Sequence, residues 1–301
     1  MQQATAQASA PGNATDELPR PRRLADVKGW FHPVDQVLFD WILSRQADRS
    51  EAGDLLELGA YLGKSAIFMG TYLRAAETFT VCDLFDSPAP DEANSAEMGR
   101  SYRSTLTRRA FEANYRAFHD DLPQIVQEPS SGITAHVEPD SCRFVHIDAS
   151  HLYEHVHADI AAAREVLGED GIVVLDDFRA EHCPGVAAAT WGAVANTGLK
   201  PLCITATKFY GTWGSYDSLH ADLAAFLKER DDMWHGAEEV ADFPMIRISG
   251  KKAKSPEQPV SRHADEIPVL DERTPEPAPQ SGGNGRAKGL FASLLSRSGR
   301  S

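Results

Sequence analysis

The chain has 301 residues, of which 42% are hydrophobic and 25% are charged. This composition is typical of a globular protein with one large domain or two small ones, and it excludes collagen and disorder of the whole chain. Thirty Lys and Arg residues stand against 44 Asp and Glu, so the formal net charge is −14. An acidic chain without a basic surface does not attract polyanions, and we therefore expect no nucleic-acid partner.

The apolar runs and the cysteines indicate the cellular compartment in which we expect the protein. No run reaches the about 18 apolar residues of a membrane span, and the first residues lack the apolar segment of a signal peptide. We therefore expect a cytoplasmic protein with no transmembrane segment. The four cysteines, Cys82, Cys142, Cys183 and Cys203, include no C-x-x-C pair. They fit buried thiols in a reducing compartment better than disulfides or a zinc site.

Composition changes towards both ends of the chain. Residues 1–27 contain no aromatic side chain, and residues 251–301 contain six prolines and a single aromatic, Phe291. Such segments bury too little apolar surface to offset the entropy of ordering, so we expect disorder there and one folded domain at 28–250. Within the last segment, residues 286–300 have the pattern of a short basic amphipathic helix, which suits weak peripheral contact with an anionic membrane.

Short apolar runs alternate with helical periodicity inside the predicted domain. In chain order, strands are predicted at 53–60, 78–85, 124–130, 142–150, 171–178 and 243–249, with a further apolar segment at 201–213. Helices are predicted at 63–76, around 95–119, at 153–168 and near 217–230. Alternation of strands and helices predicts an α/β, doubly wound domain whose parallel sheet is covered on both faces.

The first strand-to-helix turn is rich in glycine and reads ELGAYLGKS, from Glu57 to Ser65. It is not an NAD fingerprint, because Ala60 and Tyr61 stand where the second glycine is needed, and it has one residue too few for a P-loop. Asp83 closes the next strand, where a carboxylate can accept hydrogen bonds from both hydroxyls of a ribose. These features favour a nucleoside ligand that has no diphosphate.

This combination resembles the cofactor motif of class I S-adenosylmethionine-dependent methyltransferases. The segment ELGAYLGKSAIFMGTYL is similar to the cofactor loop of catechol O-methyltransferase-type enzymes. The segment VHIDASHLYEHVHADIAAAREVLGEDGIVVLDDF is similar to the metal region of that superfamily and of the bacterial methyltransferase family 24. The resemblance covers about residues 50–180, and it implies a single Rossmann-like, seven-stranded domain with S-adenosyl-L-methionine as its cofactor.

The resemblance also assigns cofactor contacts. It implies that the loop places Gly59 and Gly63 under the methionine part, and that Glu57 orients the loop. Asp83 would hold the ribose, and Ser131, for which Ser130 is an alternative, would lie near the adenine. The full set of expected cofactor contacts is Glu57, Gly59, Tyr61, Gly63, Ser65, Asp83, Ser131 and Asp148.

Three carboxylates follow two neighbouring strands. Asp148 ends the fourth strand, and Asp176 and Asp177 end the fifth, so their oxygens can converge on a hard cation such as Mg²⁺. Their spacing is similar to that of the metal ligands in catechol-type methyltransferases, which implies a divalent-cation site formed by these three residues. That subfamily usually carries Asn where this chain has Asp177. The alternative is that no ion binds and that Asp177 caps the segment after it.

His151 is the predicted catalytic base. It stands where catechol-type enzymes carry a lysine, and with Asp148 and Tyr153 it resembles the D-x-x-H-x-Y element of the bacterial family. An imidazole titrates near neutral pH and can take a proton from a hydroxyl. We predict His151 and Asp148 as catalytic residues; the alternative is a histidine that caps the following helix.

The predicted function is S-adenosylmethionine-dependent O-methylation of a small-molecule or glycan hydroxyl, with divalent-metal assistance. We expect residues 86–122 and 179–184 to bind the acceptor. Two alternatives stay open: a binding module that performs no transfer, and a non-haem iron oxygenase, which the H-x-D pattern of His146 and Asp148 permits. A homodimer also stays open.

Overall fold

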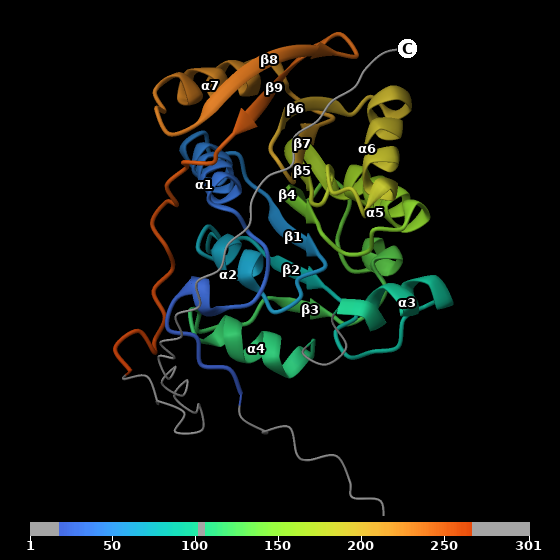
Figure 1. The fold of residues 1–301 in the computed structure, drawn as a ribbon, viewed down its shortest axis with the longest axis vertical. Helices are drawn as coiled ribbons and strands as arrows, with labels where there is room; N and C mark the ends of the chain where they lie inside the picture. The colour runs from blue at the N-terminus through green and yellow to red at the C-terminus, as the bar shows by residue number, and fades with distance from the viewer. Residues whose placement is uncertain (1–17, 102–105, 267–301) are drawn as a thin grey trace, which may run out of the picture. The chain divides into compact units, whose positions relative to one another are not determined.

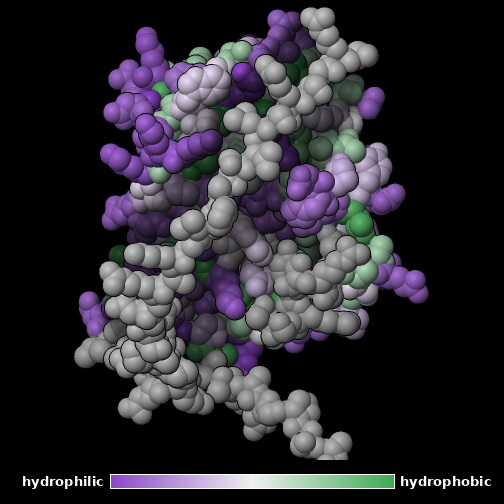
Figure 2. All heavy atoms as spheres, viewed as in Figure 1, coloured by the Kyte–Doolittle hydropathy of each residue, from purple (hydrophilic) through white to green (hydrophobic). Residues whose placement is uncertain are grey.

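The structure is a computed structural model, and it describes residues 18–101 and 106–266. The predicted amphipathic helix at 286–300 and the remaining parts of the predicted end segments, 1–17 and 267–301, lie outside the described residues. In the described ranges no helix is both long enough and apolar enough to cross a membrane. Figure 2 shows hydrophilic side chains over much of the visible face, with hydrophobic ones in small separate areas between them.

A nine-stranded mixed sheet forms the centre of the described part (Figure 1), in the order β3-β2-β1-β4-β5-β7-β6-β9-β8. The strands are β1 (Asp54–Leu58), β2 (Phe79–Cys82), β3 (Gln124–Val126), β4 (Cys142–Ile147), β5 (Leu167–Leu175), β6 (Lys200–Ile204), β7 (Phe209–Thr212), β8 (Trp234–Val240) and β9 (Phe243–Ser249). Strands β3, β2, β1, β4 and β5 are parallel, and β7 lies antiparallel between β5 and β6.

The first seven strands of this order confirm the predicted doubly wound α/β fold. Strand β9 extends the sheet parallel to β6, and β8 adds an antiparallel edge strand. Strand β8 is absent from the sequence prediction because its residues, WHGAEEV, lack the apolar alternation of a half-buried strand, and most of them are exposed.

Helices cover both faces of the sheet. They are α1 (Pro33–Asp48), α2 (Lys64–Gly70), α3 (Glu92–Ser101), α4 (Arg108–Arg116), α5 (Tyr153–Val166), α6 (Pro184–Thr197) and α7 (Asp217–Lys228), with short 3₁₀ helices η1 (Leu24–Asp26) and η2 (Ser130–Ala135). One hydrophobic core joins α1, α2, α4 and α7 to one face of the sheet, and a second joins α5, α6 and η2 to the other.

The helix predictions needed correction. The helix predicted around 95–119 is divided into α3 and α4, and α4 starts after Thr107, whose hydroxyl accepts a hydrogen bond from the Ala110 N–H at 3.1 Å. Helix α6 was not predicted as a helix, and neither was α1. The buried residues of α1 include Asp35, Gln36 and Gln46 beside the apolar ones, so no clean amphipathic stripe marks it in the sequence.

The folded part extends beyond the predicted bounds of 28 and 250. Leu24 and Val27 are buried in the first core. An antiparallel bridge joins Arg23 to Val260, and the Ser261 hydroxyl donates a hydrogen bond to the Pro21 carbonyl at 2.6 Å. The end segments around these residues are poor in apolar side chains, and they nevertheless pack against the domain. They can do so because the domain supplies most of the surface that is covered in the contact.

The register of the parallel strands sets the position of the site. Leu58 pairs with Cys82 in β2 and with Ile147 in β4, and Ile147 pairs with Leu175 in β5. All four strands therefore end at one rim. The residues that come next along each strand, Gly59, Asp83, Asp148 and Asp176, are brought together there, where ligands of open α/β sheets bind.

Candidate active site

A cavity of about 780 Å³ lies at this rim, and sites for cofactors and small substrates fall in the range of about 300–1,000 Å³. Most of the predicted site residues line it: Gly59, Tyr61, Asp83, Ser131, Asp148, His151, Asp176 and Asp177. Glu57, Gly63 and Ser65 are not among the lining residues. The structure thus brings the predicted cofactor contacts and the predicted base into one cavity. The other three residues of the glycine turn lie beneath the surface of that cavity.

The two glycines of the turn have different roles. Gly59 has φ +81°, and a Cβ built there would lie 2.2 Å from the Asp148 carbonyl oxygen. Only glycine allows the ends of β1 and β4 to approach this closely. Gly63 has φ +92°, and its added Cβ would lie 3.0 Å from the Phe111 ring. Gly63 therefore serves helix packing and the start of α2, rather than the cofactor contact expected from the sequence.

Asp83 holds the glycine turn from the end of β2. Its Oδ2 accepts hydrogen bonds from the N–H groups of Ala60 at 2.8 Å and Tyr61 at 2.9 Å, and its Oδ1 accepts one from the Phe85 N–H at 2.6 Å. A carboxylate has about four acceptor positions. With three in use, Asp83 has room for about one ribose hydroxyl, not the two expected from the sequence. Burial raises the pKa of Asp83, and these N–H groups oppose the rise.

A chain of buried polar groups runs beneath the cavity. Glu57 Oε1 lies 2.7 Å from His146 Nδ1, His146 Nε2 lies 3.0 Å from Lys208 Nζ, and Lys208 Nζ lies 2.5 Å from Asp176 Oδ2. An ammonium group can only donate, so His146 Nε2 accepts and its Nδ1–H donates to Glu57. Burial raises the pKa of Glu57 to about 8, with the Ser65 hydroxyl and the Lys208 charge opposing it.

The same series of buried hydrogen bonds excludes His146 as a metal ligand. Both of its ring nitrogens have partners, and its side chain is fully buried. Burial and the nearby Lys208 charge lower the pKa of His146 well below its ordinary value. Without a free nitrogen on His146, the H-x-D pattern does not form the start of an iron site, and the oxygenase alternative loses its ligand set.

The predicted three-carboxylate metal site does not fit this arrangement. Asp176 clusters with Asp148 and His146, whereas Asp177 clusters with His151 and Cys183. Asp176 already binds the Lys208 ammonium through Oδ2, and its Oδ1 accepts the Asp177 N–H at 2.8 Å. Burial and the neighbouring Asp176 raise the pKa of Asp148 well above its ordinary value, and the Lys208 charge opposes the rise. The three carboxylates therefore do not meet around one divalent ion.

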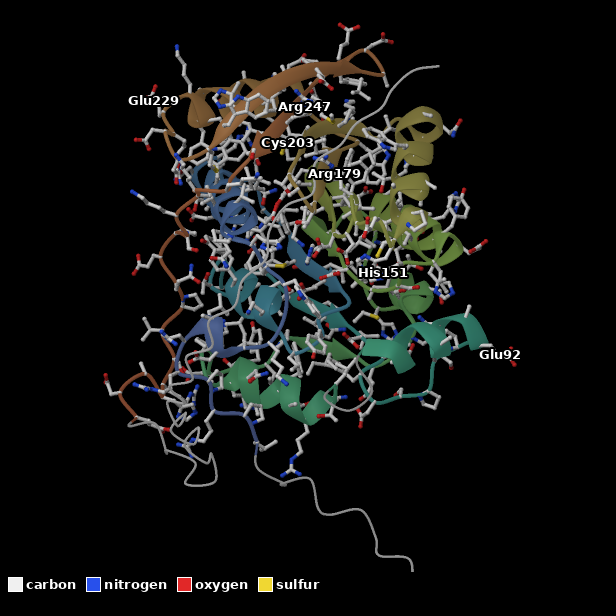
Figure 3. All side chains as sticks on the ribbon, viewed as in Figure 1. Glu92, His151, Arg179, Cys203, Glu229 and Arg247 are labelled. Carbon is white, nitrogen blue, oxygen red and sulfur yellow. The ribbon has the colours of Figure 1, made fainter. Side chains whose placement is uncertain are left out.

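Asp177 instead pairs with the predicted base. Its Oδ2 lies 3.1 Å from His151 Nε2, and this hydrogen bond lowers the pKa of the Asp177 carboxyl against the effect of burial. Asp177 has φ +53°, a left-handed conformation that is uncommon outside glycine and is often found at functional sites. His151 lies two residues before the start of α5 and is labelled in Figure 3. The pair has the arrangement of a histidine base oriented by a carboxylate.

Asp159 is a site residue that the sequence analysis did not identify. It lies in α5, is 1% exposed and lines the cavity beside Ser130 and Ser131. Among the described residues no hydrogen bond of ordinary geometry reaches either of its carboxylate oxygens, although the Ser130 hydroxyl lies near enough to oppose the rise of its pKa. Burial raises its pKa to about 6, which keeps the group mainly ionised at neutral pH. An unpaired buried acceptor beside a cavity is costly unless a ligand satisfies it.

Other lining residues of the cavity come from several separate segments. Met98 and Leu106 come from the predicted acceptor segment 86–122, and His182 comes from 179–184. Trp30, from the segment before α1, was not predicted; it stacks on Tyr61 with ring centroids 6.0 Å apart and remains 67% exposed. His155 also lines the cavity, with its Nε2 3.1 Å from Asp91 Oδ2. These residues offer both apolar surface and imidazole groups to a ligand.

Part of the chain matches a known domain family, and the fold is similar to that of solved structures. Residues 56–178 match the family Methyltransf_24, described as a methyltransferase domain. The chain is similar to the O-methyltransferase NovP, with 19% identity, 60% of this chain and 79% of that chain covered, and a TM-score of 0.50. It is also similar to CalS11, a TDP-rhamnose 3'-O-methyltransferase of calicheamicin biosynthesis, with 18% identity, coverage of 60% and 80%, and a TM-score of 0.41. No curated protein matches the chain.

Proposed function

We propose that this chain is a methyltransferase of the class I fold, and that it transfers the methyl group of S-adenosylmethionine to a hydroxyl of a small molecule or glycan. The match of residues 56–178 to a methyltransferase domain and the similarity in fold support this proposal. One observation carries the proposal. Gly59, Asp83 and Ser131, which suit a nucleoside, line the same cavity as a histidine paired with a carboxylate, His151 and Asp177. A cofactor and an acceptor can therefore meet there.

The cofactor side follows from groups on the rim. The close approach of Gly59 to Asp148 makes a backbone floor for the methionine part, and the remaining acceptor position of Asp83 takes one ribose hydroxyl. Asp159 is suited to the adenine, since its unpartnered carboxylate can accept a hydrogen bond from the 6-amino group. A site that hydrogen-bonds a substrate group in this way discriminates strongly against an analogue that lacks the group.

The transfer itself is a displacement. The acceptor oxygen forms a bond to the methyl carbon as the carbon–sulfur bond breaks, which leaves S-adenosylhomocysteine, and the hydroxyl proton passes to His151. Because the His151 Nε2–H donates to Asp177, the lone pair of the neutral ring lies on Nδ1, and the imidazolium that forms is stabilised by the carboxylate. Asp148, which lines the same cavity, orients the acceptor oxygen.

Two measurements test this function. Titration calorimetry with S-adenosylhomocysteine should show one site per chain, and a methyl-labelled cofactor should transfer label to hydroxyl compounds of a metabolite extract. Absence of binding would refute the cofactor assignment. Binding without transfer, across acceptors that include free sugars and phenols, would favour the non-catalytic binding module.

The adenine contact has its own test. S-inosylhomocysteine replaces the 6-amino donor with an acceptor, so the wild type should bind it at least about tenfold more weakly than S-adenosylhomocysteine, the loss of about one hydrogen bond to a charged group. Asp159→Ala should remove that preference. Glu128→Ala, which truncates an exposed carboxylate on the same wall, is the matched control and should keep it. An unchanged preference in Asp159→Ala would contradict the assignment.

A further inference from the structure

Lys208 lies just before β7 with its side chain fully enclosed. It is 1% exposed, and its ammonium lies 5.9 Å and 6.0 Å from the centroids of the Phe31 and Phe39 rings. Burying an ammonium is costly unless acceptors surround it. The cavity is lined by Thr207 and Asp176 but not by Lys208 itself, so the lysine supports the floor of the site and does not face a ligand.

The register of the sheet explains its position. Strand β7 is antiparallel to β5, and Phe209 pairs with Leu175. The residue before Phe209 and the residue after Leu175 are therefore neighbours, which sets the Lys208 ammonium 2.5 Å from Asp176 Oδ2. The same ammonium lies 3.0 Å from His146 Nε2. It thus contacts two of the three groups, His146, Asp148 and Asp176, that lie close enough together to hold a cation.

Other buried acids face this lysine as well. Asp148 adds negative potential from the end of β4, and Asp35 adds it from α1. Asp35 is itself held by the Tyr210 hydroxyl at 2.8 Å and the Thr205 hydroxyl at 2.8 Å. A divalent ion placed between Asp148 and Asp176 would meet a positive charge within a few ångströms. It would also have to displace that charge from Asp176 to complete its oxygen shell.

We propose that the Lys208 ammonium is the resident cation of this site. It takes the place that the sequence pattern assigns to a divalent ion, and it positions Asp176 and His146 beneath the cavity. Lys208 is a positioning residue, because it acts through Asp176 and does not contact the ligand. The inference concerns the acid cluster and not the identity of the methyl donor, so it can fail while the proposed function stands.

The test measures Mn²⁺ binding to the apo protein by electron paramagnetic resonance, with the metal alone as the probe. The wild type should show no more Mn²⁺ binding than Asp148→Asn does. Lys208→Met exposes the acid cluster without its cation and should bind Mn²⁺ at least about tenfold more tightly than the wild type, a factor equal to about 1.4 kcal/mol. Lys208→Met/Asp176→Asn should lose this gain.

Lys200→Met is the matched control. It removes the same charge from a partly buried lysine whose ammonium donates to the Gly214 carbonyl at 2.6 Å, on the neighbouring strand and outside the cavity. It should bind no more Mn²⁺ than the wild type. Equal gains in Lys200→Met and Lys208→Met would mean that net charge alone explains the binding, and would overturn the proposal.

A second readout uses turnover once an acceptor is known. Wild-type activity should persist in excess EDTA, and the lowered activity of Lys208→Met should recover partly with Mg²⁺ or Mn²⁺, which loss of structure alone would not allow. Wild-type Mn²⁺ binding that Asp148→Asn removes would overturn the proposal, and this comparison holds even if Lys208→Met does not fold. A folded Lys208→Met without Mn²⁺ affinity would overturn it too. Calorimetry with S-adenosylhomocysteine on the same samples tests the proposed function separately.

Discussion

Replacing Asp83 with Asn tests how the acidic end of β2 supports the cofactor site. The carboxylate accepts three short hydrogen bonds, from the N–H groups of Ala60, Tyr61 and Phe85. An Asn keeps one carbonyl oxygen and places an NH₂ group where the second oxygen was. If its oxygen faces Ala60 and Tyr61, the NH₂ must face the Phe85 N–H, so two donors oppose one another.

The number of hydrogen bonds that Asp83→Asn loses sets the expected loss of cofactor affinity. At least one hydrogen bond to a charged acceptor disappears, at about 1.5–3 kcal/mol, and the remaining bonds become neutral and weaker. The ribose contact uses the same group. We therefore expect the Kd for S-adenosylhomocysteine to rise at least about tenfold in Asp83→Asn, since 1.4 kcal/mol corresponds to a factor of ten.

Titration calorimetry measures this change, and a thermal unfolding curve of the same sample shows that the variant is folded. Asp86→Asn is the control. Asp86 lies three residues further along, is exposed, and accepts a hydrogen bond from the Arg108 N–H at 3.3 Å, outside the cavity. Its affinity for S-adenosylhomocysteine should equal that of the wild type. A folded Asp83→Asn protein with wild-type affinity would refute the role given to Asp83.

Three further predictions concern other parts of the domain. Gly59→Ala should lower Tm and abolish S-adenosylhomocysteine binding, because its Cβ would lie 2.2 Å from the Asp148 carbonyl oxygen; normal values of both would show that β1 and β4 do not meet as described. His151→Ala should lower kcat by about 10² to 10⁴ with cofactor affinity unchanged, as for loss of a general base, and a retained rate would remove that role. Burial raises the pKa of the half-buried Glu77, but hydrogen bonds from Arg143 and Arg74 outweigh it and hold that pKa at about 2, below its ordinary value of 4.5; the resulting stabilisation, at most about 3 kcal/mol before solvent screening reduces it, is full above pH 4.5 and is lost as pH falls towards 2. The free energy of unfolding, measured with urea, should therefore fall more between pH 5 and pH 3 in the wild type than in Glu77→Gln. Equal falls in the two proteins would contradict this.

Local patterns in the chain predict the centre of the fold. Strand and helix periodicities mark β1, β2, β4, β5 and α5, because burial on a sheet face or a helix stripe is a property of neighbouring residues. The glycine turn and Asp83 are likewise recognisable, since a tight approach of two backbones requires glycine at Gly59 wherever this turn occurs. The same periodicities do not predict helix α1, because α1 buries polar side chains, or strand β8, because β8 is largely exposed.

Which side chains meet at the site is decided by the sheet. The three carboxylates Asp148, Asp176 and Asp177 predict a metal site when only their strand ends are considered. The antiparallel return of β7 beside β5 inserts Lys208 against Asp176, and the left-handed backbone at Asp177 turns that carboxylate to His151. Lys208 lies 32 residues after Asp176 in the chain. No local pattern links a charge to a partner at that separation, because their contact depends on strand order and register, which only the packed sheet determines.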